Sequence, residues 1–322
     1  MRTDVKFDIV SMGEMIVDFT QYGASENGYT LYEQNPGGGA ANISACVARL
    51  DGRVAFLGKV GDDSIGVALK DAMLNEGVDI SGLVFDSDLK TFLAFVHVDE
   101  NNERSFSFYG HMPAHLALRP EELNLSILRD TKILAYGDKI LAVPDAFETT
   151  MQAVRIAKNA GAKIAFDPNI RLSLWSSPAS ARETILAHLP YCDFVKLSTD
   201  ELYFLTEQKN LRTGADRIML PEISLVMITD GENGAYAFTK SGVVFHPAYS
   251  VDTIDTTGAG DAFWGGTILQ IARQCKEDFS SFELEQMLSF SCACGALATT
   301  RHGAVPAMPT TDMVQRLQNQ QK

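Results

Sequence analysis

The sequence predicts an α/β protein with a mostly parallel central sheet flanked by helices. Two observations support this fold class. Short apolar runs alternate with longer segments of helical periodicity along most of the chain. The apolar runs are continuous, which is typical of parallel strands buried on both faces. The 322 residues, 46% of them hydrophobic, suffice for a sizeable core in one large domain or two smaller ones.

The elements are expected in a regular order. The first part of the chain predicts strand, helix, strand and helix at FDIVSM, AANISACVARL, VAFLGKV and SIGVALKDAMLNEGV. KILAY predicts a further strand, followed by a helix over residues 145–159 that Gly161 ends. KIAFD is followed by a helix over about residues 179–188. CDFVKL and SLVMITD add two more strands.

Two segments interrupt this order. Residues 21–34 are polar and hold three tyrosines, while residues 91–109 place a DENNE turn between two runs of β-forming residues. Neither segment is bounded by a linker rich in Pro, Gly or Ser. We therefore expect a single domain over residues 1–322, with a small β-sheet lid built from segments near 14–35 and 88–112.

Composition excludes several classes of protein. The net charge of -14 disfavours binding to nucleic acid or to an anionic membrane, because the long-range field repels polyanions. MRTDVKFDIV lacks the apolar core of a signal peptide, and no apolar stretch is long enough to span a bilayer, so a cytoplasmic location is expected. The five cysteines are odd in number and form no CxxC pair, which argues against a disulfide framework and a zinc site.

The stretch DTTGAGDAFWGG, residues 255–266, permits two interpretations. Gly258, Ala259 and Gly260 precede an apolar segment that should be helical, so their N–H groups would be unpaired donors at a helix N-terminus. Small residues let an anion approach closely, and Asp261 in the first turn would serve as a general base. Equally, the glycines shape a turn and Asp261 complements the helix dipole.

Two further glycine-rich windows are ambiguous in the same way. In NPGGGAANISACVARL, three glycines precede a helix and Asn42 lies in its first turn, although any tight connection would suit them. TDGENGAYAF is either an ordinary turn between strands or a place where Thr229, Gly231 and Gly234 approach phosphates.

Polar residues also follow predicted strands. Asp167 ends a strand in FDPNIRLSLW, and Arg171 follows on the loop as a salt-bridge partner or a substrate contact. Asp18 is expected to end the first strand in the same way. Ligands of parallel sheets bind outside the carboxyl ends of the strands, which favours a binding role for these side chains.

Several motifs are absent from the sequence. It contains no GxxxxGK[ST] phosphate loop, no GxGxxG after the first strand, no GxSxG and no HExxH. These absences remove support for P-loop enzymes, dinucleotide oxidoreductases, serine hydrolases and metalloproteases.

Six windows in order, PGGGAAN, GKVGDDSIG, FDPNIRLSLW, KLSTDEL, TDGENGA and DTTGAGDAF, resemble the ribokinase-like or PfkB family of carbohydrate kinases over almost the whole chain. FDPNIRLSLW, GKVGDD and LAFV resemble its fructokinases most closely. The resemblance implies a ribokinase-like three-layer sandwich with a β-sheet lid over the sugar. It also implies transfer of the ATP γ-phosphoryl group to a sugar hydroxyl.

The resemblance assigns roles to individual residues. Asp261 corresponds to the base, and the N–H groups of Gly258, Ala259 and Gly260 to the anion hole. The sugar contacts correspond to Asp18, Gly37, Gly38, Asn42 and Arg171. The nucleotide positions are Thr229, Gly231, Gly234 and Thr256, and Glu201 corresponds to the glutamate that organises Mg²⁺. A monovalent cation, K⁺, would be bound at Asp255, Thr257, Ala298 and Gly303.

The sequence departs from the family pattern at three positions. Ser198 stands where the NxxE motif has Asn, which concerns the water-mediated contacts of Mg²⁺. Gly110 and His115 stand where fructokinases usually have Arg and Asp. These two positions border the lid and therefore bear on the choice of sugar.

The leading hypothesis is an ATP-dependent kinase that converts fructose to fructose 6-phosphate. A 2-keto-3-deoxygluconate kinase would also use Arg171, to meet a carboxylate. The further alternatives are a nucleoside or aminoimidazole-riboside kinase and a catalytically silent sugar-binding regulator. The exposed strands of the lid favour a homodimer formed through the lid.

Overall fold

The computed structural model describes residues 1–98, 104–109, 113–137 and 141–321. Over these residues, nine strands form a central sheet in the order β13-β12-β11-β10-β9-β8-β1-β4-β5. Every pair from β5 to β11 is parallel, and β12 and β13 are antiparallel additions at one edge. The strands are β1 (Phe7–Met12), β4 (Val54–Gly61), β5 (Asp79–Asp86), β8 (Thr131–Gly137), β9 (Lys163–Asp167), β10 (Phe194–Ser198), β11 (Leu225–Thr229), β12 (Ala235–Thr239) and β13 (Gly242–His246).

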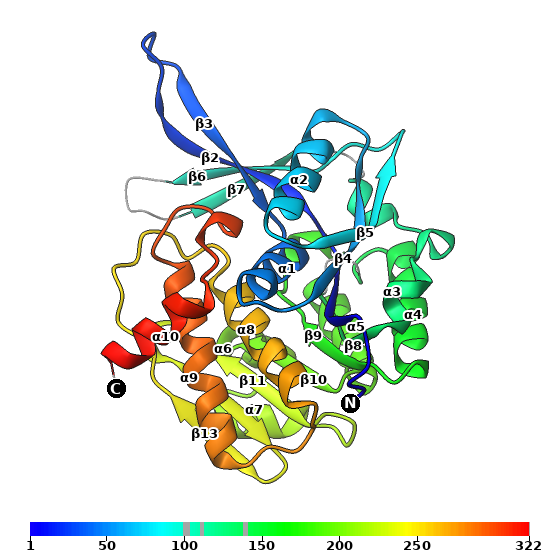
Figure 1. Cartoon of the computed structure of the whole chain (residues 1–322), viewed down its shortest axis with the longest axis vertical. Helices are drawn as coiled ribbons and strands as arrows, with labels where there is room; N and C mark the ends of the chain where they lie inside the picture. The colour runs from blue at the N-terminus through cyan, green and yellow to red at the C-terminus, as the bar shows by residue number, and fades with distance from the viewer. Residues whose placement is uncertain (99–103, 110–112, 138–140, 322) are drawn as a thin grey trace.

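Helices cover both faces of this sheet (Figure 1). One face carries α1 (Gly39–Arg49), α2 (Ser64–Asn75), α8 (Ala259–Gln274), α9 (Ser281–Ala298) and α10 (Thr311–Gln320). The other face carries α3 (Leu125–Arg129), α4 (Pro144–Asn159), α5 (Pro178–His188), α6 (Thr199–Thr206) and α7 (Leu211–Ile218). The predicted three-layer fold is confirmed.

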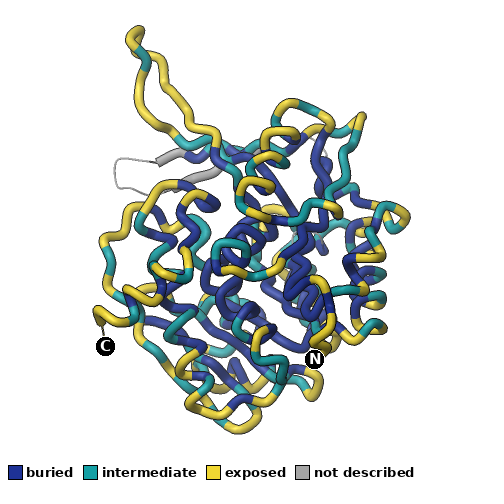
Figure 2. Tube along the Cα trace, viewed as in Figure 1, coloured by how far each residue is buried: buried dark blue, intermediate teal, exposed yellow. Residues whose placement is uncertain are grey.

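Strand residues alternate between the two cores. Ile9 of β1 and Ile133 of β8 pack with α1 and α8, whereas Val10 and Leu134, the next residues, pack with α4. A strand whose successive side chains enter two apolar layers must be apolar throughout. This explains the continuous apolar runs in the sequence, and the buried centre of the molecule in Figure 2.

A second sheet has four strands in the order β3-β2-β6-β7. Its members are β2 (Ile16–Ala24), β3 (Thr30–Gly37), β6 (Leu93–Val98) and β7 (Arg104–Tyr109). The β2–β3 hairpin projects from the body of the molecule, and its tip is exposed (Figures 1 and 2). The predicted small β-sheet is thereby confirmed. Gly110, one of the departures from the family pattern, lies outside the described residues.

The expected position of Asp18 at the end of the first strand is wrong. β1 ends at Met12, and Gly13 follows with a φ of +152°, where a side chain is rarely accommodated. The chain leaves the central sheet at this glycine and enters the second sheet, where Asp18 lies within β2 opposite Asn35. The apolar run around Ile16 belongs to this new strand.

The part of the chain that the structure describes contains no helix long and apolar enough to cross a membrane. All five cysteines are free thiols.

Candidate active site

The stretch around Gly258 forms the N-terminus of α8. Gly258 is the N-cap, with a φ of +79°. A Cβ at this position would lie 2.9 Å from the Cβ of Ala304, so both the backbone and the packing require glycine. Ala259 donates its N–H to the Thr256 carbonyl at 3.3 Å and is used within the turn. The helix start is where the sequence predicted it, and its role as an anion hole stays a prediction.

Asp261 lies in the first turn of α8 and is buried, with 8% of its surface exposed. It lines a cavity at the carboxyl ends of the central strands β1, β8 and β9. The lining residues are Ser11, Glu14, Gly39, Ala40, Ile43, Tyr136, Gly137, Asp167, Asn169 and Asp261. Segments far apart in the sequence therefore converge on one acidic cavity, as expected for a ligand site of a parallel sheet.

Asn42 is directly bonded to Asp261. Its Nδ2 donates a hydrogen bond to Oδ2 of Asp261 at 2.8 Å, across 219 positions of sequence. The Asn42 Oδ1 is buried and has no hydrogen-bond partner within the described residues. Asn42 thus fixes one oxygen of the Asp261 carboxylate, and its own Oδ1 can accept a hydrogen bond from a ligand. The sequence placed Asn42 near a ligand but gave no sign of its contact with Asp261.

Close packing requires glycine at the first two glycine positions of PGGG. A Cβ on Gly37 would overlap the Asp18 carboxylate, so Asp18 lies directly against this backbone. Gly38 has a φ of +104°, and a Cβ there would be 2.6 Å from the Glu14 carbonyl. Gly39 donates its N–H to Oε1 of Glu14 at 2.7 Å. The structure thus adds Glu14, which lines the cavity and was not identified from the sequence.

Arg171 does not line this cavity. Its guanidinium donates to the carbonyls of Asn169 and Ile170, at 3.2 and 3.1 Å, and its surface is exposed. The lining residue from this loop is Asn169, whose φ of +47° is unusual for a residue with a side chain. Sequence reasoning singled out the charged residue and missed its amide neighbour. A substrate contact by Arg171 stays a prediction.

Glu201 and Ser198 form a reciprocal cap at the start of α6. The Ser198 hydroxyl accepts from the Glu201 N–H, while Oε2 of Glu201 accepts from the Ser198 N–H at 2.7 Å. Oε1 of Glu201 accepts from the Ile170 N–H, also at 2.7 Å. Serine at position 198 therefore has a definite structural role in this chain. Glu201 is fixed in orientation and, as a carboxylate, retains further acceptor capacity.

The predicted nucleotide residues lie at neighbouring strand ends. Thr229 ends β11 opposite Ser198 of β10. Gly231 and Gly234 follow in the turn to β12, with φ values of +56° and +123°. A Cβ at Gly231 would contact no other atom, so glycine is favoured there by the positive φ and not by packing. Thr256 is exposed on the loop before α8.

The four residues predicted for a monovalent cation come together in two adjoining loops and at the end of α9, which precedes the second loop. The buried Asp255 carboxylate accepts from the Thr257 N–H at 2.7 Å and from the Gly303 N–H at 3.1 Å. Ala298 ends α9 just before the second loop, and Thr299 accepts from the Asp255 N–H. Within the described residues, the carbonyls of Ala298 and Gly303 accept no hydrogen bond. Carbonyl oxygens in this state are suitable ligands for a cation.

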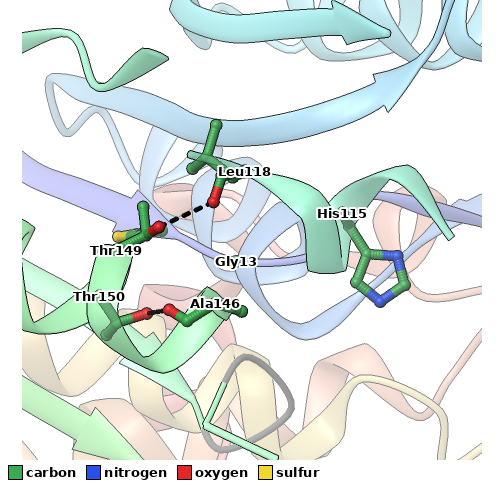
Figure 3. A pocket seen from close by; sticks show the side chains of 7 residues that line it. Gly13, His115, Leu118, Ala146, Thr149 and Thr150 are labelled. Atoms are coloured by element: carbon green, nitrogen blue, oxygen red, sulfur yellow. Dashed lines mark hydrogen bonds between the residues drawn. The ribbon is translucent and has the colours of Figure 1, made fainter. Parts of the chain in front are cut away.

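His115 lies in a second, smaller hollow (Figure 3). This hollow is lined by Met12, Gly13, His115, Leu118, Ala146, Thr149 and Thr150. Thr149 donates to the Leu118 carbonyl at 2.8 Å, and the His115 ring packs edge-on against Phe92. Met12 and Gly13 line this hollow, whereas Ser11 and Glu14 line the acidic cavity. The departure at His115 therefore lies outside the lining of the acidic cavity.

The fold and the acidic, glycine-lined cavity fit the small-molecule kinases that the sequence motifs resemble. Residues 6–311 match the family described as pfkB family carbohydrate kinase. The chain belongs to this family, and the resemblance seen in the sequence is confirmed.

Relatives cover nearly the whole chain. Fructokinase-2 of Oryza sativa subsp. japonica is 40% identical over 315 residues, which are 96% of this chain and 93% of that protein. A fructokinase of Xylella fastidiosa, solved with bound ATP, has a TM-score of 0.90 at 33% identity and covers 97% of this chain and 98% of its own. A double mutant of the Vibrio cholerae O395 fructokinase, solved with fructose, ADP and a potassium ion, has a TM-score of 0.86 at 31% identity, covering 98% and 99%.

Proposed function

We propose that this carbohydrate kinase transfers the γ-phosphoryl group of ATP to fructose and forms fructose 6-phosphate. The observation that carries the phosphoryl transfer is the buried Asp261 at the N-terminus of α8, in a cavity that Gly39 of PGGG also lines. The similarity to fructokinases of Oryza sativa and Xylella fastidiosa supports fructose as the acceptor.

In the proposed mechanism, the Asp261 carboxylate accepts the proton of the sugar hydroxyl as that oxygen bonds to the γ-phosphorus. The bond between this phosphorus and the bridging oxygen of ADP breaks at the same time. The N–H groups at the start of α8, from Gly258, Ala259 and Gly260, stabilise the negative charge on the transferring group, and that of Ala259 would leave the Thr256 carbonyl to do so. Phosphoryl transfer depends on positioning and charge stabilisation, which a base at a helix N-terminus supplies.

The substrate contacts are proposed from position. The sugar would be held by Asp18, Gly37, Gly38, Asn42 and Arg171, and the nucleotide by Thr229, Gly231, Gly234 and Thr256. The Oδ1 of Asn42 has no hydrogen-bond partner in the described part of the chain, which supports a hydroxyl contact because a buried acceptor needs a donor. A single domain over residues 1–322, with the small β-sheet as a lid over the sugar, belongs to the same proposal.

Two metal ions complete the proposal. Glu201 would orient the water shell of Mg²⁺, which neutralises phosphate charge when bound. Asp255, Thr257, Ala298 and Gly303 would hold K⁺ through backbone carbonyls, beside the start of α8. The carbonyls of Ala298 and Gly303 support the cation site because they accept no hydrogen bond within the described part of the chain.

The function is tested by coupled ADP release across a panel of sugars, with and without K⁺. We expect the highest kcat/KM with fructose, and a higher rate when K⁺ is present. Turnover on 2-keto-3-deoxygluconate or on aminoimidazole riboside, with none on fructose, would replace the sugar but keep the kinase. Sugar binding without turnover on any substrate would support a silent regulator.

We predict that Gly37→Ala weakens sugar binding. The new methyl group would collide with the Asp18 carboxylate, which must then move away from its place at the β2–β3 pair. We expect KM for fructose to rise about tenfold, the effect of a loss of about 1.4 kcal/mol in binding, while KM for ATP stays within twofold. Steady-state kinetics measure both constants. Gly28→Ala is the control, because a Cβ there contacts no atom although its φ of +80° strains the backbone, so it adds strain without a collision. An unchanged KM for fructose in Gly37→Ala would contradict the prediction.

A homodimer formed through the lid is also proposed. Tyr22, Tyr29 and Leu31 on the β2–β3 hairpin are exposed by 77%, 74% and 44%, and β3 is an edge strand of its sheet. Exposed apolar side chains beside an open strand edge favour association. Light scattering after size-exclusion chromatography should give twice the mass of the chain, and a monomer would count against this assembly.

A cytoplasmic location is proposed from the five free thiols.

A further inference from the structure

A buried ion pair joins the carboxyl ends of β9 and β10. Lys196 donates from Nζ to Oδ2 of Asp167 at 2.8 Å, and only 7% and 3% of the two side chains are exposed. Burying a lysine and a carboxylate together is costly, and a hydrophobic pair of similar size is often at least as stable. The pair therefore needs an explanation other than stability.

Both members of the pair have unused hydrogen-bonding capacity. Oδ1 of Asp167 is buried without a hydrogen-bond partner among the described residues. Lys196 has three donors, and its hydrogen bond to Asp167 is the single one found over the same residues. A purely structural pair would be expected to satisfy its polar atoms, because each unsatisfied buried group is destabilising. The spare donors of Lys196 indicate an anionic ligand.

The position of Lys196 indicates that the anionic ligand is a phosphoryl group. A Cβ at Gly260 would lie 3.2 Å from Nζ of Lys196, so the ammonium is next to the first turn of α8. Asp167 lines the same cavity as Asp261. Burial opposes the charge on Lys196, but Asp167, Glu201 and Asp261 outweigh it and raise the pKa of the ammonium. A permanent positive charge is thus held beside the N–H groups proposed to receive a phosphoryl group.

We propose that Lys196 is a catalytic residue whose ammonium contacts the transferring phosphoryl group, and that Asp167 is its positioning residue. This inference rests on the proposed kinase function and deepens it. Lys196 exchanges no proton in the reaction. Its spare N–H groups meet the oxygens of the phosphoryl group while the bond to ADP breaks and the bond to the sugar forms, where added charge stabilisation is most effective.

The first test is kinetic. Lys196→Met removes the ammonium and keeps an unbranched side chain that is one atom shorter, and we expect kcat to fall about 30-fold, the effect of losing one hydrogen bond made by a charged group. KM for fructose and for ATP should stay within threefold. Lys196→Arg should recover part of the loss, because it restores a cation. Asp167→Asn should lower kcat by about tenfold, also without a change in KM, since the ammonium loses its charged partner.

Lys132→Met is the matched control. Lys132 is also a buried lysine in an ion pair, with Asp8 at 2.8 Å, but it lies near the start of β8, at the opposite end of the parallel strands. We expect this variant to lose thermal stability and keep its kcat. If Lys196→Met loses only stability, or if its kcat equals that of the wild type, the catalytic role of Lys196 is wrong.

The second test measures binding without turnover. Calorimetry with fructose present compares ADP alone with ADP plus aluminium fluoride, a mimic of the transferring phosphoryl group. The wild type should bind the mixture at least tenfold more tightly than ADP, and Lys196→Met should lose this gain while its affinity for ADP is unchanged. An equal gain in the variant would overturn the inference. Absence of wild-type turnover on every sugar would instead refute the proposed function.

Discussion

Asp261→Asn should lower kcat by about 10³-fold, within the range that general base catalysis contributes. The amide is nearly the same size as the carboxylate but cannot accept the hydroxyl proton. Fructose binding should persist, because the fold around α8 and the glycines of PGGG are unchanged. Coupled ADP release gives kcat, and calorimetry with fructose gives the affinity. Activity within tenfold of the wild type would remove Asp261 as the base.

Asp255→Asn is the informative comparison, since the two carboxylates lie six positions apart, one in the loop before α8 and one in its first turn, and are both buried. Asp255 accepts two backbone N–H groups and holds the loops around the proposed cation site. Its loss should therefore weaken activation by K⁺, with a smaller fall in kcat at saturating K⁺ than for Asp261→Asn. Equal losses of kcat in the two variants at every K⁺ concentration would contradict the separate roles of Asp255 and Asp261.

The local features of the fold could be predicted from the sequence. FDIVSM corresponds to β1 at both ends, and the helices expected over residues 145–159 and about 179–188 are α4 and α5. The start of α8 at Gly258 could be predicted because glycine, small residues and an acidic first turn are local signals. These features depend on a few neighbouring residues, and the sequence contains them.

Contacts between distant segments could not be predicted. The sequence indicated Asn42 and Asp261 separately, but their hydrogen bond depends on α1 and α8 packing side by side on one face of the sheet. The pairing of Asp167 with Lys196 likewise depends on β9 and β10 being neighbours. Asp18 was misplaced because the apolar run after Gly13 looks like a continuation of β1, although it begins a strand of another sheet.

Asn42→Asp should lower kcat and make the loss depend on pH, with the largest loss on the acid side. In the wild type a neutral amide donates to Asp261 at 2.8 Å, whereas the variant places a second carboxylate at that distance. Two carboxylates so close cannot both ionise easily, so the pKa of the Asp261 base should rise in the variant. Because a raised pKa moves the ionisation of the Asp261 base to higher pH, activity should recover as pH increases. The acid limb of the kcat profile should therefore move to higher pH.

Asn42→Ala separates charge from the loss of a hydrogen bond. This variant also lacks the donor to Asp261 and the buried Oδ1, so its sugar affinity should fall, but it adds no negative charge. Its kcat profile should keep the acid limb of the wild type. A shared shift in both variants would mean that the hydrogen bond, not repulsion, sets the ionisation of the base. An unshifted profile in Asn42→Asp would show that the amide does not control Asp261, and that the contact between α1 and α8 serves packing alone.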